Sequence, residues 1–196
     1  MKVMIVGLPM SGKSTLFSAV TGIAIDPYAA PEAHHAITNV PDHRLAYLAE
    51  LIHPKKVAET TIELWDVPGC SLDDPKGIEE WRRHLPTVRL ADLVVVVVRD
   101  FANDAIPAYR DRIDPVADFE AVWEELIFAD LDTVTTRVER LEKSLKKPTR
   151  SHEEEKRELA LLTRCREALE NESPLSSVIT TEEEHRLVSS FAFLTE

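Results

Sequence analysis

The sequence predicts an α/β protein with a mostly parallel sheet flanked by helices, into which an antiparallel helical hairpin is inserted. The sheet is indicated by short apolar runs at 3–6, 60–67 and 93–98, which are separated by loops or helical stretches. Runs of this kind are typical of buried strands in a parallel sheet. The hairpin is indicated by two stretches after residue 118 in which apolar residues recur with helical spacing.

The first half of the chain alternates strands with helices. The strand at 3–6 feeds a glycine-containing turn, and a helix is expected at 14–20. Residues 23–36 are rich in Pro, Ala and His without a period, so a loop is expected there. A short strand is expected at 37–40, followed by a helix over 42–52 that begins at an aspartate N-cap and places Leu45, Leu48 and Ile52 on one face.

The second half is mainly helical. A helix is expected near 78–85, between the strands at 60–67 and 93–98. A heptad-like seam then follows, formed by Ile127, Leu131, Val134, Val138, Leu141 and Leu145. A break at 147–149 separates it from a second helix over 152–170, so the two helices should fold back on each other. Thr181 with Glu184 indicates a capping box at the start of a last helix.

Composition restricts the classes of function. The chain has 196 residues, of which 44% are apolar, and a formal net charge of −12. This acidic balance argues against indiscriminate binding to nucleic acid, which needs a basic surface. Cys70 and Cys165 show no CxxC spacing, so neither a disulfide framework nor a zinc site is expected. The most apolar run, 94–98, is too short to span a bilayer, and we expect a soluble cytoplasmic protein with no membrane partner.

The turn after the first strand carries the most specific motif. Residues 7–14 read GLPMSGKS and fit the pattern GxxxxGK[ST] in full. In this pattern the backbone N–H groups surround phosphate oxygens, Lys13 contacts the β and γ phosphates, and the Ser14 hydroxyl binds Mg²⁺. A chance glycine turn is the alternative, but a strand precedes the motif and a helix follows it. We expect a P-loop NTPase-type fold whose nucleotide-binding residues are Gly7, Leu8, Pro9, Met10, Ser11, Gly12, Lys13, Ser14 and Thr15.

A second motif, DVPG at 66–69, ends the strand at 60–67. In P-loop NTPases an aspartate at such a strand end holds Mg²⁺, and the backbone N–H of the glycine can meet the γ phosphate. We therefore expect Ser14 and Asp66 to hold the metal, and Lys13 and Gly69 to serve catalysis. A plain turn is the alternative, since DxxG alone is a weak pattern.

Taken together, these motifs resemble the Obg-like GTPases, and within them the YchF subfamily of ribosome-associated nucleotide hydrolases. The matching parts are residues 6–17, 40–50, 54–56 and 60–69, then Arg99, Asp114-Pro115 and residues 125–143. The resemblance implies a nucleoside triphosphatase that binds GTP or ATP with Mg²⁺, acts as a regulatory switch and carries a coiled-coil insertion. We expect a nucleotide-binding core at 1–115, the hairpin at 116–172, and a return to the nucleotide-binding domain at 173–196.

Some residues depart from the family pattern in ways that bear on hydrolysis. Met10 replaces an asparagine that helps potassium-stimulated relatives hold a monovalent cation. Ala30 occupies the position of the switch I threonine that would coordinate Mg²⁺. Cys70 follows DxxG where Ras-like enzymes use a glutamine to orient water. Slow hydrolysis is therefore expected, and a nucleotide-binding scaffold that has lost hydrolysis is the alternative.

The switch II region departs as well. The family is glycine-rich after DxxG, whereas this chain has Asp73, Glu79 and Trp81 at positions where glycines are expected. Side chains at these positions restrict the backbone in a way that glycine does not. A stiffer or differently shaped switch II is therefore expected.

The resemblance also implies parts that we expect beyond Glu196. One is the motif that reads the base, NKxD for guanine or the NxxE form that favours adenine, and another is the family's TGS domain. A truncated product is therefore expected, and the choice between GTP and ATP stays open. A P-loop kinase is disfavoured because the chain offers DxxG and a helical hairpin instead of an arginine-bearing lid.

Basic residues gather at the predicted tip of the hairpin. They are Lys143, Lys146, Lys147 and Arg150. A solvated tip is the simple interpretation. The family resemblance favours a sharper one, in which the tip contacts phosphates of ribosomal RNA.

Overall fold

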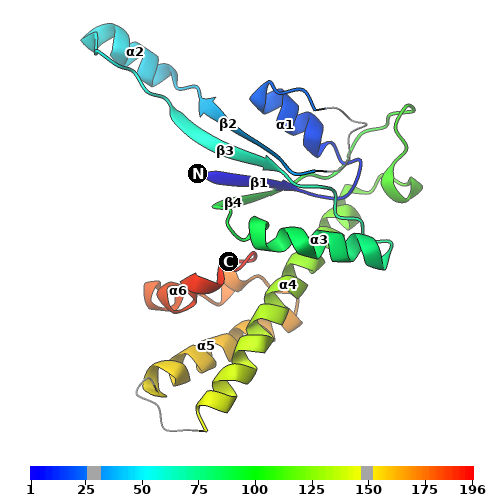
Figure 1. Cartoon of the computed structure of the whole chain (residues 1–196), viewed down its shortest axis with the longest axis vertical. Coiled ribbons are helices and arrows are strands. Elements are labelled where there is room, and N and C mark those ends of the chain that lie inside the picture. The colour runs from blue at the N-terminus through cyan, green and yellow to red at the C-terminus, as the bar shows by residue number, and fades with distance from the viewer. Residues whose placement is uncertain (26–31, 147–151) are drawn as a thin grey trace. The chain divides into compact units, whose positions relative to one another are not determined.

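The computed structural model describes residues 1–25, 32–146 and 152–196, and it divides into two compact units, Met1–Phe119 and Glu120–Glu196. In the described part of the first unit, the strands form a sheet with the order β2–β3–β1–β4 (Figure 1). Their bounds are Lys2–Val6 for β1, His34–Val40 for β2, Thr60–Asp66 for β3 and Leu93–Val96 for β4. β1 lies parallel to β3 and β4, whereas β2 runs antiparallel to β3. The predicted mostly parallel α/β sheet is therefore confirmed.

The core of the first unit lies where α1 (Lys13–Thr21) packs against β1, β2 and β3. Phe17 of α1 is fully buried and belongs to one apolar cluster with Val3, Ile5 and Leu64. Because β1 lies between two neighbouring strands, its residues after Lys2, VMIV, are continuously apolar and buried instead of alternating. The central position of β1 places the loop that follows it next to the ends of both neighbouring strands.

β2 begins earlier than the sequence indicated. The prediction placed a strand at 37–40 and a loop before it, but β2 starts at His34. The reason is pairing: every residue of β2 faces a residue of β3, from His34 opposite Asp66 to Val40 opposite Thr60. His35 also contacts Glu63 of β3, with 3.1 Å between Nε2 and Oε1. Cross-strand contacts of this kind decide strand limits that local composition does not.

The helix that follows, α2 (His43–Ile52), starts at the predicted N-cap, where the Asp42 side chain accepts a hydrogen bond from Arg44 N at 2.9 Å. Its apolar residues do not enter the core. No side chain of α2 is buried, and Tyr47, Leu51 and Ile52 are 66%, 66% and 67% exposed. Figure 1 shows α2 at the far end of the long β2–β3 ladder. The apolar face predicted for this helix therefore lies on the surface of the first unit.

The helix predicted at 78–85 is longer in the structure. α3 spans Pro75–Val88 and begins at Asp74, whose carboxylate accepts a hydrogen bond from Gly77 N at 2.8 Å. Pro75 at the first helical position suits this start because its fixed φ is helical and its missing N–H would be unpaired there. Trp81 and Val88 bury one face of α3. This helix directly follows the loop that contains Gly69.

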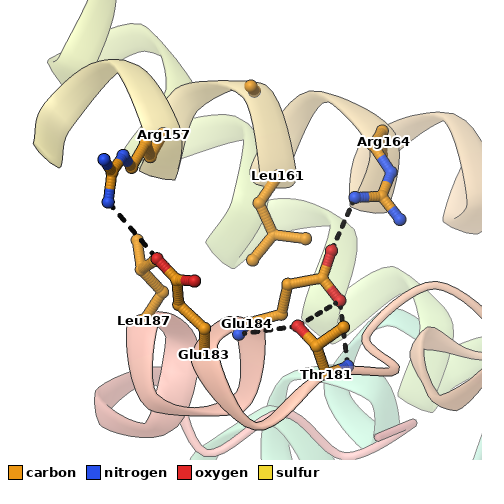
Figure 2. Close-up of a pocket in the computed structure, with 8 residues that line it drawn as sticks. Arg157, Leu161, Arg164, Thr181, Glu183, Glu184 and Leu187 are labelled. Carbon is orange, nitrogen blue, oxygen red and sulfur yellow. Dashed lines mark hydrogen bonds and ion pairs between the residues drawn. The ribbon is translucent and has the colours of Figure 1, made fainter. Parts of the chain in front are cut away.

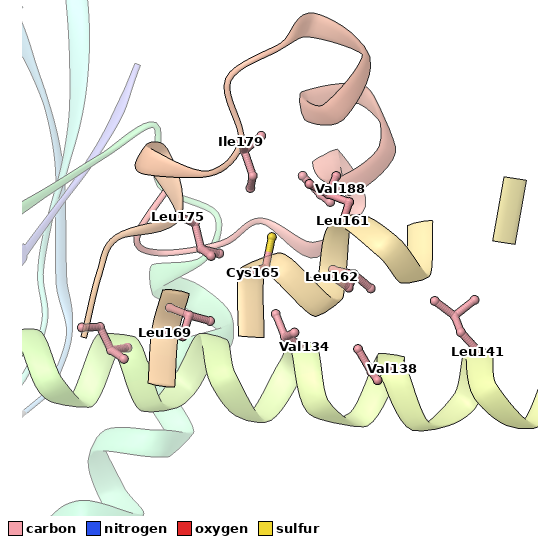
Figure 3. Packing of buried hydrophobic residues seen from close by; sticks show 11 residues of the cluster. Val134, Val138, Leu141, Leu161, Leu162, Cys165, Leu169, Leu175, Ile179 and Val188 are labelled. Carbon is pink, nitrogen blue, oxygen red and sulfur yellow. The ribbon is translucent and has the colours of Figure 1, made fainter. Parts of the chain in front are cut away.

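In the second unit, α4 (Pro115–Ser144) and α5 (His152–Glu170) form the predicted antiparallel pair. Two contacts show the direction: Arg137 pairs with Glu158, and further along α4 Ser144 donates to Glu155 at 3.0 Å. The apolar seam is buried between the helices (Figure 3), with Val134, Val138, Leu141, Leu162, Cys165 and Leu169 at 2% exposure or less.

The rest of the second unit covers this seam. It contains α6 (Glu182–Val188) and short 3₁₀ turns at Leu175–Ser177 and Ser189–Phe191, in addition to the turn at Tyr109–Asp111 in the first unit. Leu175, Ile179 and Val188 join the apolar cluster. Thr181 and Glu184 form the predicted capping box. No helix within the described ranges is both long and apolar enough to cross a membrane.

Candidate phosphate-binding site

The loop between β1 and α1 has a backbone that glycines permit. Gly7 has φ +149°, and a Cβ at this position would lie 2.3 Å from the carbonyl oxygen of Val97. Gly12, with φ +101°, is the N-cap of α1. Met10 is also left-handed, with φ 59°. A loop curled in this way directs consecutive backbone N–H groups to one side, where the N-terminus of α1 adds its positive dipole.

Lys13 lies inside this loop. Its side chain is buried, and its Nζ donates a hydrogen bond to the carbonyl oxygen of Leu8 at 2.8 Å. Burial lowers the pKa of Lys13 to about 8, although Asp66 and Cys70 act in the opposite direction. A buried ammonium whose hydrogen bond goes to a neutral carbonyl oxygen gains from an additional anionic partner. The arrangement therefore suits a phosphate group.

Two buried polar atoms at this loop and at the end of β3 lack a hydrogen-bond partner within the described residues. They are Ser11 Oγ and Asp66 Oδ1, in side chains that are 4% and 3% exposed. An unpaired buried carboxylate is unfavourable unless a cation or a donor compensates it. Oxygen ligands of this type are those that Mg²⁺ prefers. The donor set of Asp66 with the exposed Ser14 therefore fits a magnesium ion, which those two residues would hold.

The turn after β3 packs directly on the P-loop. A Cβ on Gly69 would lie 2.9 Å from Pro9 Cα, so only glycine fits at this approach. Cys70 N donates to the Gly7 carbonyl oxygen at 3.0 Å, and Val67 N donates to Ile5 O at 3.1 Å. The structure thus brings the DxxG turn together with the P-loop, although the two are about fifty residues apart in the sequence. The roles assigned to these residues stay predictions.

Sequence reasoning assigned no role to the segment after β4, which contains Arg99. The Arg99 side chain is buried and donates to the carbonyl oxygens of Phe101, Ile106 and Pro107 at 3.1, 2.8 and 3.0 Å. Phe101 Cε1 lies 3.8 Å from where a Cβ of Gly12 would stand. Arg99 therefore shapes a loop that reaches the P-loop. The match of Arg99 to the family pattern was the available signal.

Some of the predicted residues lie elsewhere. Ala30, Lys147 and Arg150 fall outside the described residues. Lys143 and Lys146 are exposed near the end of α4.

A shallow groove in the second unit is a different kind of feature (Figure 2). It has a volume of about 320 Å³ and lies between α5 and α6. Its charged side chains pair with one another: Arg157 with Glu183 at 3.3 Å, and Arg164 with Glu184 at 2.7 Å. These contacts attach α6 to α5, and they leave Leu161 as the apolar floor between them. The groove therefore offers no unsatisfied polar group for chemistry.

Comparison with known proteins gives a consistent result. The family model described as "50S ribosome-binding GTPase" matches residues 2–149. The chain is 37% identical over 195 residues to the "Ribosome-binding ATPase YchF" of Bacillus subtilis (strain 168), covering 97% of this chain and 52% of that protein. The protein with the same description from Escherichia coli O157:H7 is 35% identical, with 97% and 53% covered.

A solved structure is also similar over the whole chain. The Schizosaccharomyces pombe YchF GTPase superposes with a TM-score of 0.79 at 28% identity, covering 100% of this chain and 54% of that one. The chain therefore spans about half the length of the curated relatives and of the solved structure that it matches.

Proposed function

Because the chain belongs to the family of 50S ribosome-binding GTPases, we propose that it binds GTP or ATP with Mg²⁺ at the P-loop and hydrolyses the nucleotide slowly as a regulatory switch. The family match and the YchF relatives confirm the resemblance to the Obg-like GTPases of the YchF subfamily. The observation that carries the proposal is the buried Lys13 inside a curled glycine loop, in electrostatic contact with Asp66, whose Oδ1 has no hydrogen-bond partner within the described residues.

Each residue of the phosphate-binding site has its own role in this proposal. Lys13 moves from the Leu8 carbonyl oxygen to the β and γ phosphates and offsets part of their charge, while backbone N–H groups of the loop at 7–14, other than Pro9, surround them. Ser14 and Asp66 would hold Mg²⁺, and the ion would stabilise the charge on the phosphate oxygens. The Gly69 N–H meets the γ phosphate, so the loop after it responds to triphosphate and not to diphosphate.

Slow hydrolysis follows from Cys70. Its side chain is fully buried and follows DxxG directly, where a glutamine would otherwise orient the attacking water. The same observation favours a second candidate function, a nucleotide-binding scaffold without hydrolysis. Phosphate release under saturating nucleotide separates the two, because a scaffold releases none above the background rate.

The proposed partner is the ribosome. The Bacillus subtilis and Escherichia coli relatives are named ribosome-binding ATPases, and we extend that partner to this chain through the basic end of α4, at Lys143 and Lys146. Ribosome binding would place the protein in the cytoplasm.

The nucleotide proposal is tested by titrating fluorescent ATP and GTP against the wild type and Lys13→Ala. Loss of a charge-assisted contact should weaken triphosphate affinity about tenfold to a hundredfold. Lys55→Ala removes an exposed lysine as the matched control and should bind like the wild type. Asp66→Asn should lose most of the gain in affinity that Mg²⁺ gives the wild type. Equal affinities of the wild type and Lys13→Ala would rule out the P-loop as the phosphate site.

A further inference from the structure

The segment after β4, residues 99–111, contacts both loops of the proposed phosphate site. At one end, Arg99 donates hydrogen bonds to three backbone carbonyl oxygens, and Phe101 lies against the P-loop at Gly12. At the other end, Tyr109 and Arg110 reach the loop after DxxG. We name residues 69–74 the switch II loop. One short segment therefore touches the P-loop and the switch II loop together.

The contacts to the switch II loop are specific. Leu72 N donates a hydrogen bond to the Tyr109 hydroxyl oxygen at 3.0 Å. Arg110 Nε donates to Asp73 Oδ1 at 2.6 Å. The pKa of Asp73 is lowered from its ordinary value, mainly by the hydrogen bond from Tyr109 and further by Arg110. The guanidinium carbon of Arg110 also lies 5.3 Å from the centre of the Tyr109 ring. The two side chains thus form one unit that holds consecutive residues of the loop.

The backbone at this point is held in an unusual conformation. Arg110 and Asp111 have φ values of 60° and 51°, in the left-handed region that non-glycine residues rarely adopt. Such residues persist where surrounding contacts determine them, and they cluster at ligand clamps and switch regions. Here the Arg110 side chain contacts Asp73 and Tyr109, and Asp111 N donates to the Ala108 carbonyl oxygen at 3.1 Å.

From this geometry we propose that Tyr109 and Arg110 are positioning residues for switch II, which latch Leu72 and Asp73 to the segment after β4 and so keep Gly69 against Pro9 of the P-loop. The proposal rests on the proposed nucleotide function of that loop. Asp73 stands where the family resemblance implies a glycine. The residue that pairs with Arg110 therefore also restricts the backbone of the switch II loop. We call the contacts of Tyr109 and Arg110 with Leu72 and Asp73 the latch. The latch replaces a mobile switch II loop by one that is held close to the phosphate site.

The latch should slow hydrogen exchange at the amides of the switch II loop. Amide hydrogen exchange of the whole chain measures these rates directly. Tyr109→Phe removes the hydroxyl that accepts from Leu72 N and hydrogen-bonds Asp73. Arg110→Gln removes the guanidinium that pairs with Asp73 and lies over the Tyr109 ring. The pair is 31% and 45% exposed, so each change should speed exchange at residues 70–74 by about threefold to fivefold. Arg83→Gln, which breaks an exposed ion pair with Glu79 on α3, is the matched control and should leave this exchange unchanged.

A charge reversal tests the contact itself. Arg110→Asp places two carboxylates together and should open the loop further, although aspartate tolerates the left-handed backbone at this position better than arginine does. The double variant Asp73→Arg/Arg110→Asp restores an opposite-charge pair and should return exchange toward the wild-type rate. Equal exchange in the wild type, Tyr109→Phe and Arg110→Gln would overturn the latch, as would failure of the double variant to improve on Arg110→Asp.

Nucleotide measurements separate a positioning role from a merely structural one. Dissociation constants for fluorescent Mg-ATP should stay within about twofold in Tyr109→Phe and Arg110→Gln, because the P-loop contacts are intact, whereas single-turnover phosphate release should slow by about threefold to fivefold. Unchanged release beside faster exchange would overturn the positioning role. If the wild type binds no nucleotide, the proposed function fails and the positioning role falls with it, while the exchange arm still decides whether the latch exists.

Discussion

Arg137 of α4 and Glu158 of α5 form a two-pronged ion pair, with Nε to Oε1 at 2.7 Å and Nη2 to Oε2 at 2.8 Å. Glu158 is largely buried, with 11% of its side chain exposed, whereas Arg137 is 38% exposed. The pair therefore joins the two helices at a position where each carboxylate oxygen has its own donor.

The first prediction concerns this pair. Glu158→Ala should lower the free energy of unfolding by about 1–2 kcal/mol, since it removes two charge-assisted hydrogen bonds that are partly screened by solvent. Urea denaturation followed by circular dichroism measures the change. Glu79→Ala breaks an exposed pair with Arg83 on α3 and should cost less than about 0.5 kcal/mol. Equal midpoints for the two variants would contradict the prediction.

The second prediction concerns the glycines. Gly7→Ala should destabilise the protein by about 2 kcal/mol or more and abolish nucleotide binding, because the new Cβ would meet the Val97 carbonyl oxygen in a strained backbone. Gly22→Ala is the matched control, since Gly22 has φ +73° but no atom within 4 Å of its added Cβ. It should cost about 1 kcal/mol and leave nucleotide affinity unchanged. Thermal unfolding and a fluorescent ATP titration give both quantities, and normal binding by Gly7→Ala would refute this reading of the loop.

A third prediction follows from the pKa of Lys13, which burial lowers from 10.5 to about 8. The ammonium is charged below this pKa and neutral above it, so ATP affinity should fall as the pH rises through about 8. The unfolded chain keeps the proton up to about pH 10.5, so it binds more protons than the folded chain between these values. Stability without nucleotide should therefore rise with pH in that window.

The check on Lys13 is a set of ATP titrations between pH 7 and pH 9.5. Lys13→Met keeps an unbranched side chain, one atom shorter, without a titratable group, and its weak affinity should show no step near pH 8. A wild-type affinity that is flat across this range would contradict the assigned pKa.

A fourth prediction concerns Cys165. Burial raises the pKa of this thiol to about 11, and the thiolate is the reactive form. At pH 8 its alkylation by iodoacetamide should be slower in the native protein than in urea by about a hundredfold or more. Mass spectrometry of the peptide that contains Cys165 follows the reaction. Rates within tenfold of each other would show that the seam between α4 and α5 opens readily.

The fifth prediction concerns the basic end of α4. Lys143→Ala/Lys146→Ala should weaken binding to purified ribosomes, and the slope of log affinity against log salt should fall by about 2 if both lysines contact phosphates. Cosedimentation at several salt concentrations measures this slope. Lys156→Ala on α5 is the matched control and should keep the wild-type slope. An unchanged slope in the double variant would place the ribosomal contact elsewhere.

Several features were predictable because their causes are local. The P-loop is a run of consecutive residues whose glycines set the backbone within one turn, so the pattern at 7–14 indicates its curled shape, while its ligand stays a prediction. The capping box of Thr181 and Glu184 spans a single helical turn. The apolar seam of α4 repeats with the helical period, which alone indicates which side is buried.

Other features had no local signal. The pattern of α2 predicted an apolar face, yet the helix buries nothing within the described chain, since amphipathic spacing does not say whether a partner surface is present. The first residues of β2 have poor strand composition, and their pairing with β3 decides their conformation.

The sequence by itself determined the phosphate loop, the parallel strands and the helical hairpin, because each depends on short-range hydrogen bonding or on a repeating period. Only the tertiary structure decided that Gly69 packs on Pro9 and that Tyr109 and Arg110 hold Leu72 and Asp73, which lie 37 residues away from them in the chain. These contacts arise because the parallel strands β1, β3 and β4 end at the same edge of the sheet, so the loops that follow the three strands lie close together. That edge is set by strand pairing over long sequence separations, and no local pattern records it.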